Sequence, residues 1–292
     1  MKLTITGYST ALFATWYFIE ELGILFDAGD GLTSALLQKS RKINHVFISH
    51  ADRDHLTGLL QFNQLNARPG LPIIHYPKDS GSFPKLEEFS KKFDPHVSGS
   101  VWTPVTAQDE IRLRDDLLVQ PIRNGHVPID KSIAKSFGYK VIQTKRKLKP
   151  ALEGLTGKEI KAISDVEGKD ATTMEVRTNI ISYSGDTPVE DLQVWNNSGI
   201  LIHEATFLGL DESIKEKPHA NKHSTLEEVI HMISGITIEK LILGHFSSRY
   251  DKAQIDQTIR TLCDKYAINI PVFRVLPGET VTDILSGTPL NG

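Results

Sequence analysis

The feature that most constrains the fold is a repeated order of apolar strand, polar loop and helix along the chain. The run Val46-Phe47-Ile48 inside His45–Ser49 is continuously apolar, which is typical of a strand buried on both faces. A polar loop follows it, and a helix is expected next, over Leu56–Leu65. This order predicts an α/β fold. The other expected strands are Lys2–Gly7, Thr15–Ile19, Gly23–Asp27, Leu71–His75, Leu117–Arg123, Asn179–Tyr183, Gly199–Ile202 and Lys240–Leu243, and the other expected helices lie over Leu32–Lys42 and near Lys85–Phe93.

Five of these strands are followed at once by polar groups that contain His or Asp. Because ligand sites in α/β sheets gather outside the carboxyl ends of the strands, these side chains are expected to converge. The groups are the loop that starts at His50, Asn124-Gly125-His126, Ser184-Gly185-Asp186, His203-Glu204 and Gly244-His245.

The strongest local signal is His50-x-Asp52-x-Asp54-His55, which places four potential metal ligands within six residues. A tight loop can direct alternate residues to one metal ion and the next pair to a second. Imidazole and carboxylate ligands suit Zn²⁺, and a carboxylate-rich site shifts the preference towards Mn²⁺ or Fe²⁺. The simpler alternative is a solvated loop in which Asp52 caps the following helix.

Three further strand ends strengthen the metal hypothesis. His126, Asp186 and His245 lie far along the chain from the loop, and with its four residues they make seven ligands. Seven ligands are enough for two metal ions a few ångströms apart. Such sites suit phosphoester hydrolysis, because one ion lowers the pKa of a bridging water and both stabilise charge in the transition state.

Glu204 and His223 form a second candidate for catalysis. A glutamate paired with His223 would hold the imidazole in one orientation and raise its basicity, so that the imidazolium can protonate a leaving oxygen. The simpler alternative is a capping box at the start of the next helix, and both can hold, since the cap would fix the histidine. The candidate capping residues are Ser224, Thr225, Glu227 and Glu228.

The charge balance excludes a bulk attraction to nucleic acid. The 292 residues carry a formal net charge of -3, so nucleic-acid binding would need a local basic patch.

The single cysteine, Cys263, cannot form an internal disulfide, which fits a cytoplasmic setting, and it is expected to fill the core. The apolar run Ala11–Ile19 is also expected in the core, because acidic residues follow it and no small-residue cleavage site appears.

One segment departs from the strand and helix rhythm. Thr144–Val176 is polar and charged, lacks strong strand character and begins Thr144-Lys145-Arg146-Lys147-Leu148-Lys149. One interpretation is a solvated helical excursion, which most charge runs are. The other is a basic arm that binds RNA, and the sequence leaves both open.

Taken in order, these residues resemble the metallo-β-lactamase superfamily and, more narrowly, the ribonuclease Z (tRNase Z) family in its compact bacterial form with a short basic arm. The resemblance covers most of the chain. The segments around His203, His223 and His245 are more specific than the His/Asp loop, which the whole superfamily shares. The matching segments are Phe47–Leu59, Gly138-Tyr139, Ser184–Thr187, His203–Phe207, His223–Thr225 and His245–Tyr250, with a looser likeness at Gly7–Trp16 and Arg146–Lys149.

The resemblance implies an αββα sandwich over residues 1–292, with two metal ions at one edge and an inserted flexible arm at about 144–176. It implies one metal site with His50, Asp52 and His126. It implies a second site with Asp54, His55 and His245, and Asp186 as the bridge between the two ions.

The resemblance also assigns chemical roles. Asp54 would take a proton from the attacking water, and Glu204 with His223 would help the leaving 3′ oxygen. Arg249 would lie near the scissile phosphate, with Thr187 as a further substrate contact. The arm would clamp the elbow of precursor tRNA, in this family often from the partner subunit of a homodimer. Its candidate contacts are Lys145, Arg146, Lys147 and Lys149.

This chain departs from the family pattern in two places, one of which affects the choice of metal and the other the choice of substrate. The family usually has His where this chain has Asp52, and the shorter, harder carboxylate would weaken Zn²⁺ binding at the first site or favour Mn²⁺ or Fe²⁺. The arm lacks the Gly-Pro element of longer arms. Two alternatives therefore stay beside a tRNA-processing endoribonuclease: a phosphodiesterase for cyclic nucleotides or other small esters, and a metal-poor, non-catalytic RNA-binding relative.

Overall fold

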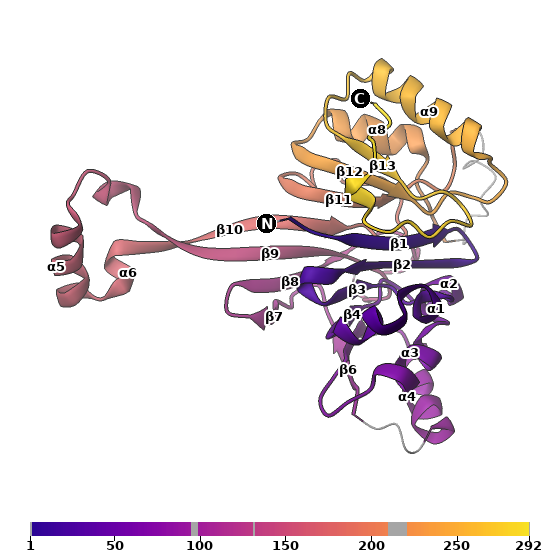
Figure 1. The fold of residues 1–292 in the computed structure, drawn as a ribbon, viewed down its shortest axis with the longest axis horizontal. Helices are drawn as coiled ribbons and strands as arrows, with labels where there is room; N and C mark the ends of the chain where they lie inside the picture. The colour runs from indigo at the N-terminus through magenta and orange to yellow at the C-terminus, as the bar shows by residue number, and fades with distance from the viewer. Residues whose placement is uncertain (1, 95–98, 131, 210–220, 292) are drawn as a thin grey trace.

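The chain folds into two β-sheets with helices on the outer face of each (Figure 1), and the computed structural model describes residues 2–94, 99–130, 132–209 and 221–291. The first sheet has the strand order β1 to β6, and the second the order β13-β12-β11-β10-β9-β8-β7. The first sheet comprises β1 (Ile5–Thr10), β2 (Ala14–Ile19), β3 (Ile24–Phe26), β4 (His45–Phe47), β5 (Ile73–Pro77) and β6 (Val101–Val105). The second comprises β7 (Ile111–Arg114), β8 (Leu117–Arg123), β9 (Phe137–Leu148), β10 (Thr173–Tyr183), β11 (Ser198–Glu204), β12 (Ile238–Gly244) and β13 (Val272–Arg274).

Helices cover the sheets from outside. Those over the first sheet are α1 (Leu32–Leu36), η2 (Leu37–Lys42), α2 (Arg53–Leu56), α3 (Leu59–Asn66) and α4 (Ser82–Phe93). Those over the second are α8 (Leu226–Ser234) and α9 (Lys252–Lys265). The other helices in the described residues are η1 (Glu20–Leu22), η3 (Pro150–Leu152), α5 (Gly157–Glu167), α6 (Lys169–Thr172) and η4 (Ile284–Ser286).

Side chains that alternate along each strand form apolar layers, one between the two sheets and one between each sheet and its helices. In β2, Tyr17 and Ile19 face the core between the two sheets, whereas Trp16 and Phe18 face the helices. Both faces of such strands are buried, which explains why they read as continuous apolar runs. The molecule is therefore the expected αββα sandwich.

Parallel pairing sets the position of the functional edge. β3, β4 and β5 run parallel in the first sheet, and β10 to β13 run parallel in the second. Their carboxyl ends, and the loops that follow them, therefore lie along one edge of the sandwich.

The expected single helix over Leu56–Leu65 is wrong in detail, because α2 and α3 are separated at Gly58. A Cβ there would lie 2.3 Å from the carbonyl oxygen of Gly29, so the close approach requires glycine.

The segment 144–176 forms an arm that projects from the body (Figure 1). The expectation that it lacks strands is wrong at both ends, because β9 and β10 pair from Leu148 with Thr173 to Gln143 with Thr178. α5 and α6 close the tip, and a capping box of Thr156 and Glu159 starts α5. The strands escaped prediction because both faces of this hairpin meet water, so no apolar alternation marks them.

Candidate metal centre

The loop after β4 and the ends of β8, β10 and β12 bring the seven predicted ligands together. His50, Asp52 and His126 form one group, here called the first triad, whose ligand atoms all lie within 4.8 Å of one another. The Nε2 atoms of both histidines are 3.5 Å from Oδ2 of Asp52. A residue from the loop after β8 thus joins two from the loop after β4 at one point.

The second triad comprises Asp54, His55 and His245. Nε2 of His55 and Nε2 of His245 lie 3.5 and 3.4 Å from Oδ2 of Asp54. All three side chains are largely buried. The second triad repeats the composition of the first with two residues from α2 and one that follows β12.

Asp186 lies between the triads. Its Oδ2 is 3.7 Å from Nε2 of His50 in the first triad. The same atom is 3.2 Å from Nε2 of His55 and 3.3 Å from Nε2 of His245. This buried carboxylate can therefore reach an ion in either triad, as a bridging ligand must.

The spacing and protonation of the donors fit divalent metal ions. Two ligands about 2.0–2.1 Å from a tetrahedral ion lie roughly 3.3–3.4 Å apart, close to the separations within each triad. Among the described residues, Nε2 of His50 and Nε2 of His55 are buried without a hydrogen-bond partner. Buried polar atoms without partners are costly, and a bound cation would satisfy both.

The Nδ1 atoms of the four histidines are all occupied, which fixes the tautomer. Nδ1 of His126 donates to the carbonyl of Lys222 at 2.7 Å, and Nδ1 of His55 donates to Asp27 at 2.7 Å. A carbonyl oxygen and a carboxylate oxygen both accept, so Nδ1 is the donor in both rings, and Nε2 is the nitrogen that faces the metal site.

Two hydroxyls fix the remaining imidazoles in the same way. Ser49 donates its proton to Asp27 at 2.8 Å and therefore accepts from Nδ1 of His50 at 2.9 Å. Thr206 donates to Glu204 at 2.6 Å and accepts from Nδ1 of His245 at 2.9 Å. These partners were not identified from the sequence.

Asp27 is the main residue that sequence reasoning missed. It is fully buried, adopts a left-handed φ of 52°, and also accepts from the backbone N–H of Ser49 at 2.7 Å and from the hydroxyl of Tyr183 at 2.5 Å. Its position at the end of β3 was the available signal, because the other strand-end aspartate and histidines were selected for the same reason.

The charges within the centre support one another. Burial alone would raise the pKa of Asp54, but the imidazoles of His245 and His55 hold that pKa well below its usual range. Burial would lower the pKa of His55, but the carboxylates of Asp186 and Asp27 raise it. Asp54 is therefore anionic at neutral pH and can bind a cation.

Glu204 and His223 form the expected pair. Nδ1 of His223 lies 3.2 Å from Oε1 of Glu204, and His223 is partly exposed while Glu204 is buried. The capping box also exists, between Thr225 and Glu228 at the start of α8. The cap fixes the backbone next to His223, so the pair and the capping box exist side by side.

Asp52 does not cap a helix. It occupies the N-cap position of α2, but its side chain makes no cap hydrogen bond. Its Oδ2 instead faces the first triad and accepts from Nδ2 of Asn221 at 2.8 Å. The capping alternative is wrong because the two imidazoles and this amide hold the carboxylate in the centre.

The candidate substrate contacts lie in two places. The exposed guanidinium of Arg249 lies over the rings of Phe207 and Tyr250, and its Nε donates to Ser247 at 3.1 Å. Thr187 is buried, and its backbone N–H donates to Glu204 at 2.8 Å. The basic residues of the arm, Lys145, Arg146, Lys147 and Lys149, lie at or near the end of β9, away from the centre.

Three described histidines that carry no predicted role, His45, His75 and His231, lie outside the centre. His45 and His75 stack on each other within the first sheet, where burial lowers the pKa of His45 to about 4 and that of His75 to about 3. His231 lies on α8, and Cys263 is buried in the core as expected. His96 and His219 lie outside the described residues.

No family model matches the chain. Among curated proteins, it is 30% identical over 280 residues to the chloroplastic tRNase Z of Arabidopsis thaliana, covering 91% of this chain and 73% of that protein. The chain belongs to the tRNase Z family. A ribonuclease Z of Methanocaldococcus jannaschii is a further relative, 28% identical over 263 residues, which cover 79% of this chain and 78% of that protein.

Solved structures confirm the fold of this tRNase Z family member. The metallo-β-lactamase fold protein YhfI of Bacillus subtilis superposes with a TM-score of 0.64 and 13% identity, covering 96% of this chain and 100% of the other. The human short-form tRNase Z superposes with a TM-score of 0.60 and 19% identity, covering 96% and 99%. The chain is a hydrolase of the metallo-β-lactamase fold, distantly related to ribonuclease Z, with histidine and aspartate clusters consistent with a binuclear metal site. No described helix is both long and apolar enough to cross a membrane.

Proposed function

We propose that this protein is a two-metal phosphodiesterase that cleaves precursor tRNA on its 3′ side. The observation that carries the proposal is the arrangement of two ligand triads around Asp186, with the Glu204–His223 pair beside them. Zn²⁺ is the expected metal, and the carboxylate of Asp52 makes Mn²⁺ or Fe²⁺ the alternatives at the first triad.

The side chains of the centre divide the chemistry between them. Two bound ions would lower the pKa of an attacking water and offset negative charge on the phosphate. Asp54 is anionic and largely buried, and it accepts the proton of that water. His223, oriented by Glu204, protonates the leaving 3′ oxygen. Arg249 contacts the phosphate, and Thr187 positions Glu204 through its backbone N–H.

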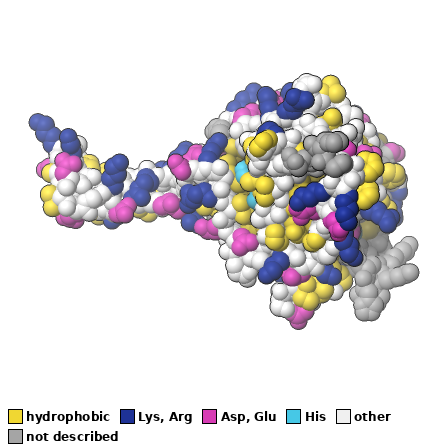
Figure 2. Space-filling view, turned by 90° about the horizontal axis from the view of Figure 1, so that it is seen from below, with side chains coloured by type: hydrophobic (Ala, Val, Ile, Leu, Met, Phe, Trp, Pro, Cys, Tyr) yellow, Lys and Arg dark blue, Asp and Glu magenta, His cyan; other side chains and the backbone are white. Residues whose placement is uncertain are grey.

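The arm supports RNA as the substrate. Lys145 and Lys147 lie two residues apart on β9 and are exposed, so they share one face of the hairpin. Arg146 lies on the opposite face, bonded to Thr173 and paired with Asp170. Acidic side chains are interspersed along the arm (Figure 2), so the arm as a whole does not attract RNA by its net charge. The face that carries Lys145 and Lys147 is the part that binds RNA.

The direction of the arm supports a homodimer. β10 is eleven residues long, so its first residue, next to the helices of the arm tip, lies roughly 33 Å from the carboxyl end of that strand, where the metal centre begins. The arm leads away from its own centre, and a tRNA held by it is better placed to reach the centre of a partner subunit.

The decisive experiment is incubation with a 3′-extended precursor tRNA and Zn²⁺ or Mn²⁺, reading the cut position. The double variant Lys145→Ala, Lys147→Ala should lose most tRNA cleavage but hydrolyse bis(p-nitrophenyl) phosphate normally. Substitution is preferable to deletion, because residues 145–148 pair with β10. Lys91→Ala, Lys92→Ala on α4 is the matched control. Equal loss on both substrates would argue against an RNA-binding arm.

The dimer can be tested by mixing subunits. Asp186→Ala lacks a functional centre, and Lys145→Ala, Lys147→Ala lacks the arm contacts. If the arm serves the partner, mixed dimers regain precursor cleavage that neither variant shows alone. A monomer in solution, or no gain on mixing after exchange is verified, contradicts the dimer.

The metal-poor alternative is tested by metal analysis of protein purified without added metal. Two equivalents bound after incubation support the proposal. Less than one equivalent, with none taken up, would favour a non-catalytic relative.

A further inference from the structure

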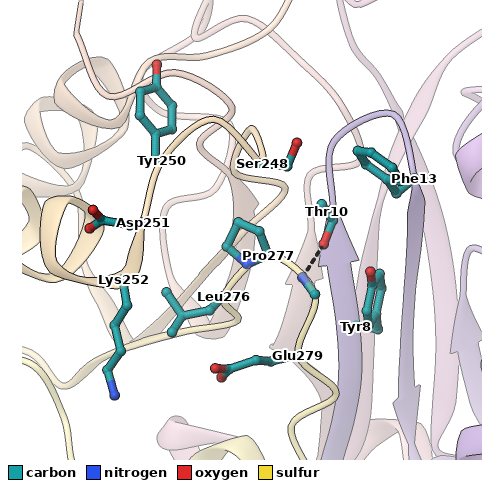
Figure 3. A pocket seen from close by; sticks show the side chains of 11 residues that line it. Tyr8, Thr10, Phe13, Ser248, Tyr250, Asp251, Lys252, Leu276, Pro277 and Glu279 are labelled. Carbon is teal, nitrogen blue, oxygen red and sulfur yellow. Dashed lines mark hydrogen bonds between the residues drawn. The ribbon is translucent and has the colours of Figure 1, made fainter.

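A cavity lies beside the metal centre, against the hairpin of β1 and β2. Its volume is about 470 Å³, within the roughly 300–1,000 Å³ range of small-molecule sites. Figure 3 shows Tyr8 and Phe13 on the hairpin side, with Tyr250 and Lys252 across the cavity and Pro277 between them. The hydroxyl oxygen of Thr10 accepts from the backbone N–H of Gly278 at 2.9 Å and joins two of the walls.

The walls of the cavity are continuous with the second triad. The backbone N–H of Leu12, at the hairpin tip, donates to Oδ2 of Asp54 at 3.1 Å. Thr10 forms a β-bridge with Phe246, the residue after the ligand His245. Ser248, a few residues further on, lines the cavity itself. A group bound here would therefore lie next to a phosphate bound at the metal centre.

The hairpin tip carries features that are unusual for a solvated turn. Leu12 and Phe13 are 88% and 61% exposed. Leu12 adopts a left-handed φ of 70°, which is strained for a side chain of this type. Exposed apolar side chains next to a catalytic centre indicate a surface that a ligand covers.

The chemistry of the lining suits an aromatic ring better than a phosphate. Tyr8 and Phe13 offer aromatic rings, and Leu276 with Pro277 adds apolar surface. The charged lining side chains are Lys252, Asp251 and Glu279, one ammonium against two carboxylates. The lining therefore offers no excess of positive charge for a free anion, whereas a nucleobase can stack on the aromatic rings, a contact that is tolerant of sequence.

We propose that this cavity receives the unpaired base of the nucleotide just 3′ to the scissile phosphate. The proposal rests on the proposed function for its substrate. The upstream nucleotide carries the leaving 3′ oxygen and is expected beside His223. The cavity lies instead beside Asp54, so its occupant is the downstream nucleotide, which keeps the phosphate after cleavage.

A binding experiment tests the base contact without cleavage. Metal-loaded protein is titrated with adenosine 5′-monophosphate, which mimics the downstream product, and with ribose 5-phosphate, which lacks the base. The nucleotide should bind at least about fivefold more tightly, as base stacking predicts. Phe13→Ala should remove most of that preference. Phe93→Ala, with an equally exposed ring at 61% on α4, should keep it.

A cleavage experiment tests which nucleotide is bound. Precursor tRNAs with one abasic nucleotide, either just 3′ or just 5′ to the cut, are compared with the intact precursor. For each protein variant, the cleavage rate is divided by its rate of bis(p-nitrophenyl) phosphate hydrolysis. Wild-type protein should be slowed at least fivefold by the 3′ abasic position, and Phe13→Ala should show little further loss on that substrate.

The outcomes separate the two proposals. Equal binding of nucleotide and ribose 5-phosphate, or an unchanged preference in Phe13→Ala, overturns the base site. A selective loss from the 5′ abasic position overturns the assignment to the downstream nucleotide. If no precursor is cleaved while the nucleotide preference depends on Phe13, the tRNA proposal fails and the base site stands.

Discussion

The two ligand triads have the same composition, two histidines and one aspartate, but the fold supports them differently. In the second triad, His55 is held by the fully buried Asp27, and Asp54 accepts from the backbone of Leu12. These supports come from β3 and the β1–β2 hairpin, which are parts of the first sheet.

The first triad is more open and depends on a distant segment. The side chain of Asp52 is 46% exposed, whereas that of Asp54 is 10% exposed. Asn221 and the carbonyl of Lys222, just before α8, hold Asp52 and His126. The comparison teaches that the second triad is preformed by the core, while the first requires residues 221–222 to be in place.

The largest effect is expected where the triads share a ligand. Asp186→Ala should reduce turnover of a small phosphodiester by more than the roughly 10–100-fold typical for loss of an outer partner, since both ions lose a direct ligand. Metal content should fall below two equivalents per chain. Wild-type turnover in this variant would remove Asp186 from the bridge.

Asp27→Asn tests the support of the second triad. The amide loses the negative charge that holds the Nδ1 proton of His55, so metal affinity at that triad should fall roughly 10–100-fold. Affinity is measured by competition with a chelator, with thermal unfolding as the control for folding. Because Asp27 reaches His50 of the first triad only through Ser49, the loss there should be smaller, and equal loss from both triads would contradict the difference in their support.

Asp52→His tests the chemistry of the first triad. A neutral imidazole replaces a hard carboxylate, so Zn²⁺ should be held more tightly relative to Mn²⁺, by roughly tenfold. Competition between the two ions, read by elemental analysis and by the Mn²⁺ paramagnetic resonance signal, measures the change. An unchanged preference would show that Asp52 does not set it.

The smallest effect is expected from Asn221→Ala. It removes one hydrogen bond to a half-exposed carboxylate, so metal affinity at the first triad should fall only a few-fold, below the usual range for an outer partner. The second triad should be unaffected. A loss as large as that of Asp27→Asn would contradict the difference between the triads.

The sequence by itself determined the candidate ligands and the fold class. The spacing of His50 to His55 is local, and His126, Asp186 and His245 each follow an apolar strand whose direction places its end at the same edge. The pair of Glu204 and His223 could be proposed for the same reason. Apolar strands and the polar groups that follow them are local features of the sequence, so they can be predicted from short stretches of it.

Only the tertiary structure decided how those ligands are held. Asp27 is 28 residues from His55, and Asn221 is 169 residues from Asp52, so no local pattern links them. The contact of Leu12 with Asp54 uses a backbone N–H, which any residue but proline would offer. The strands of the arm likewise form by backbone hydrogen bonds to each other. Because their side chains face water, they carry no apolar pattern from which this pairing could be predicted.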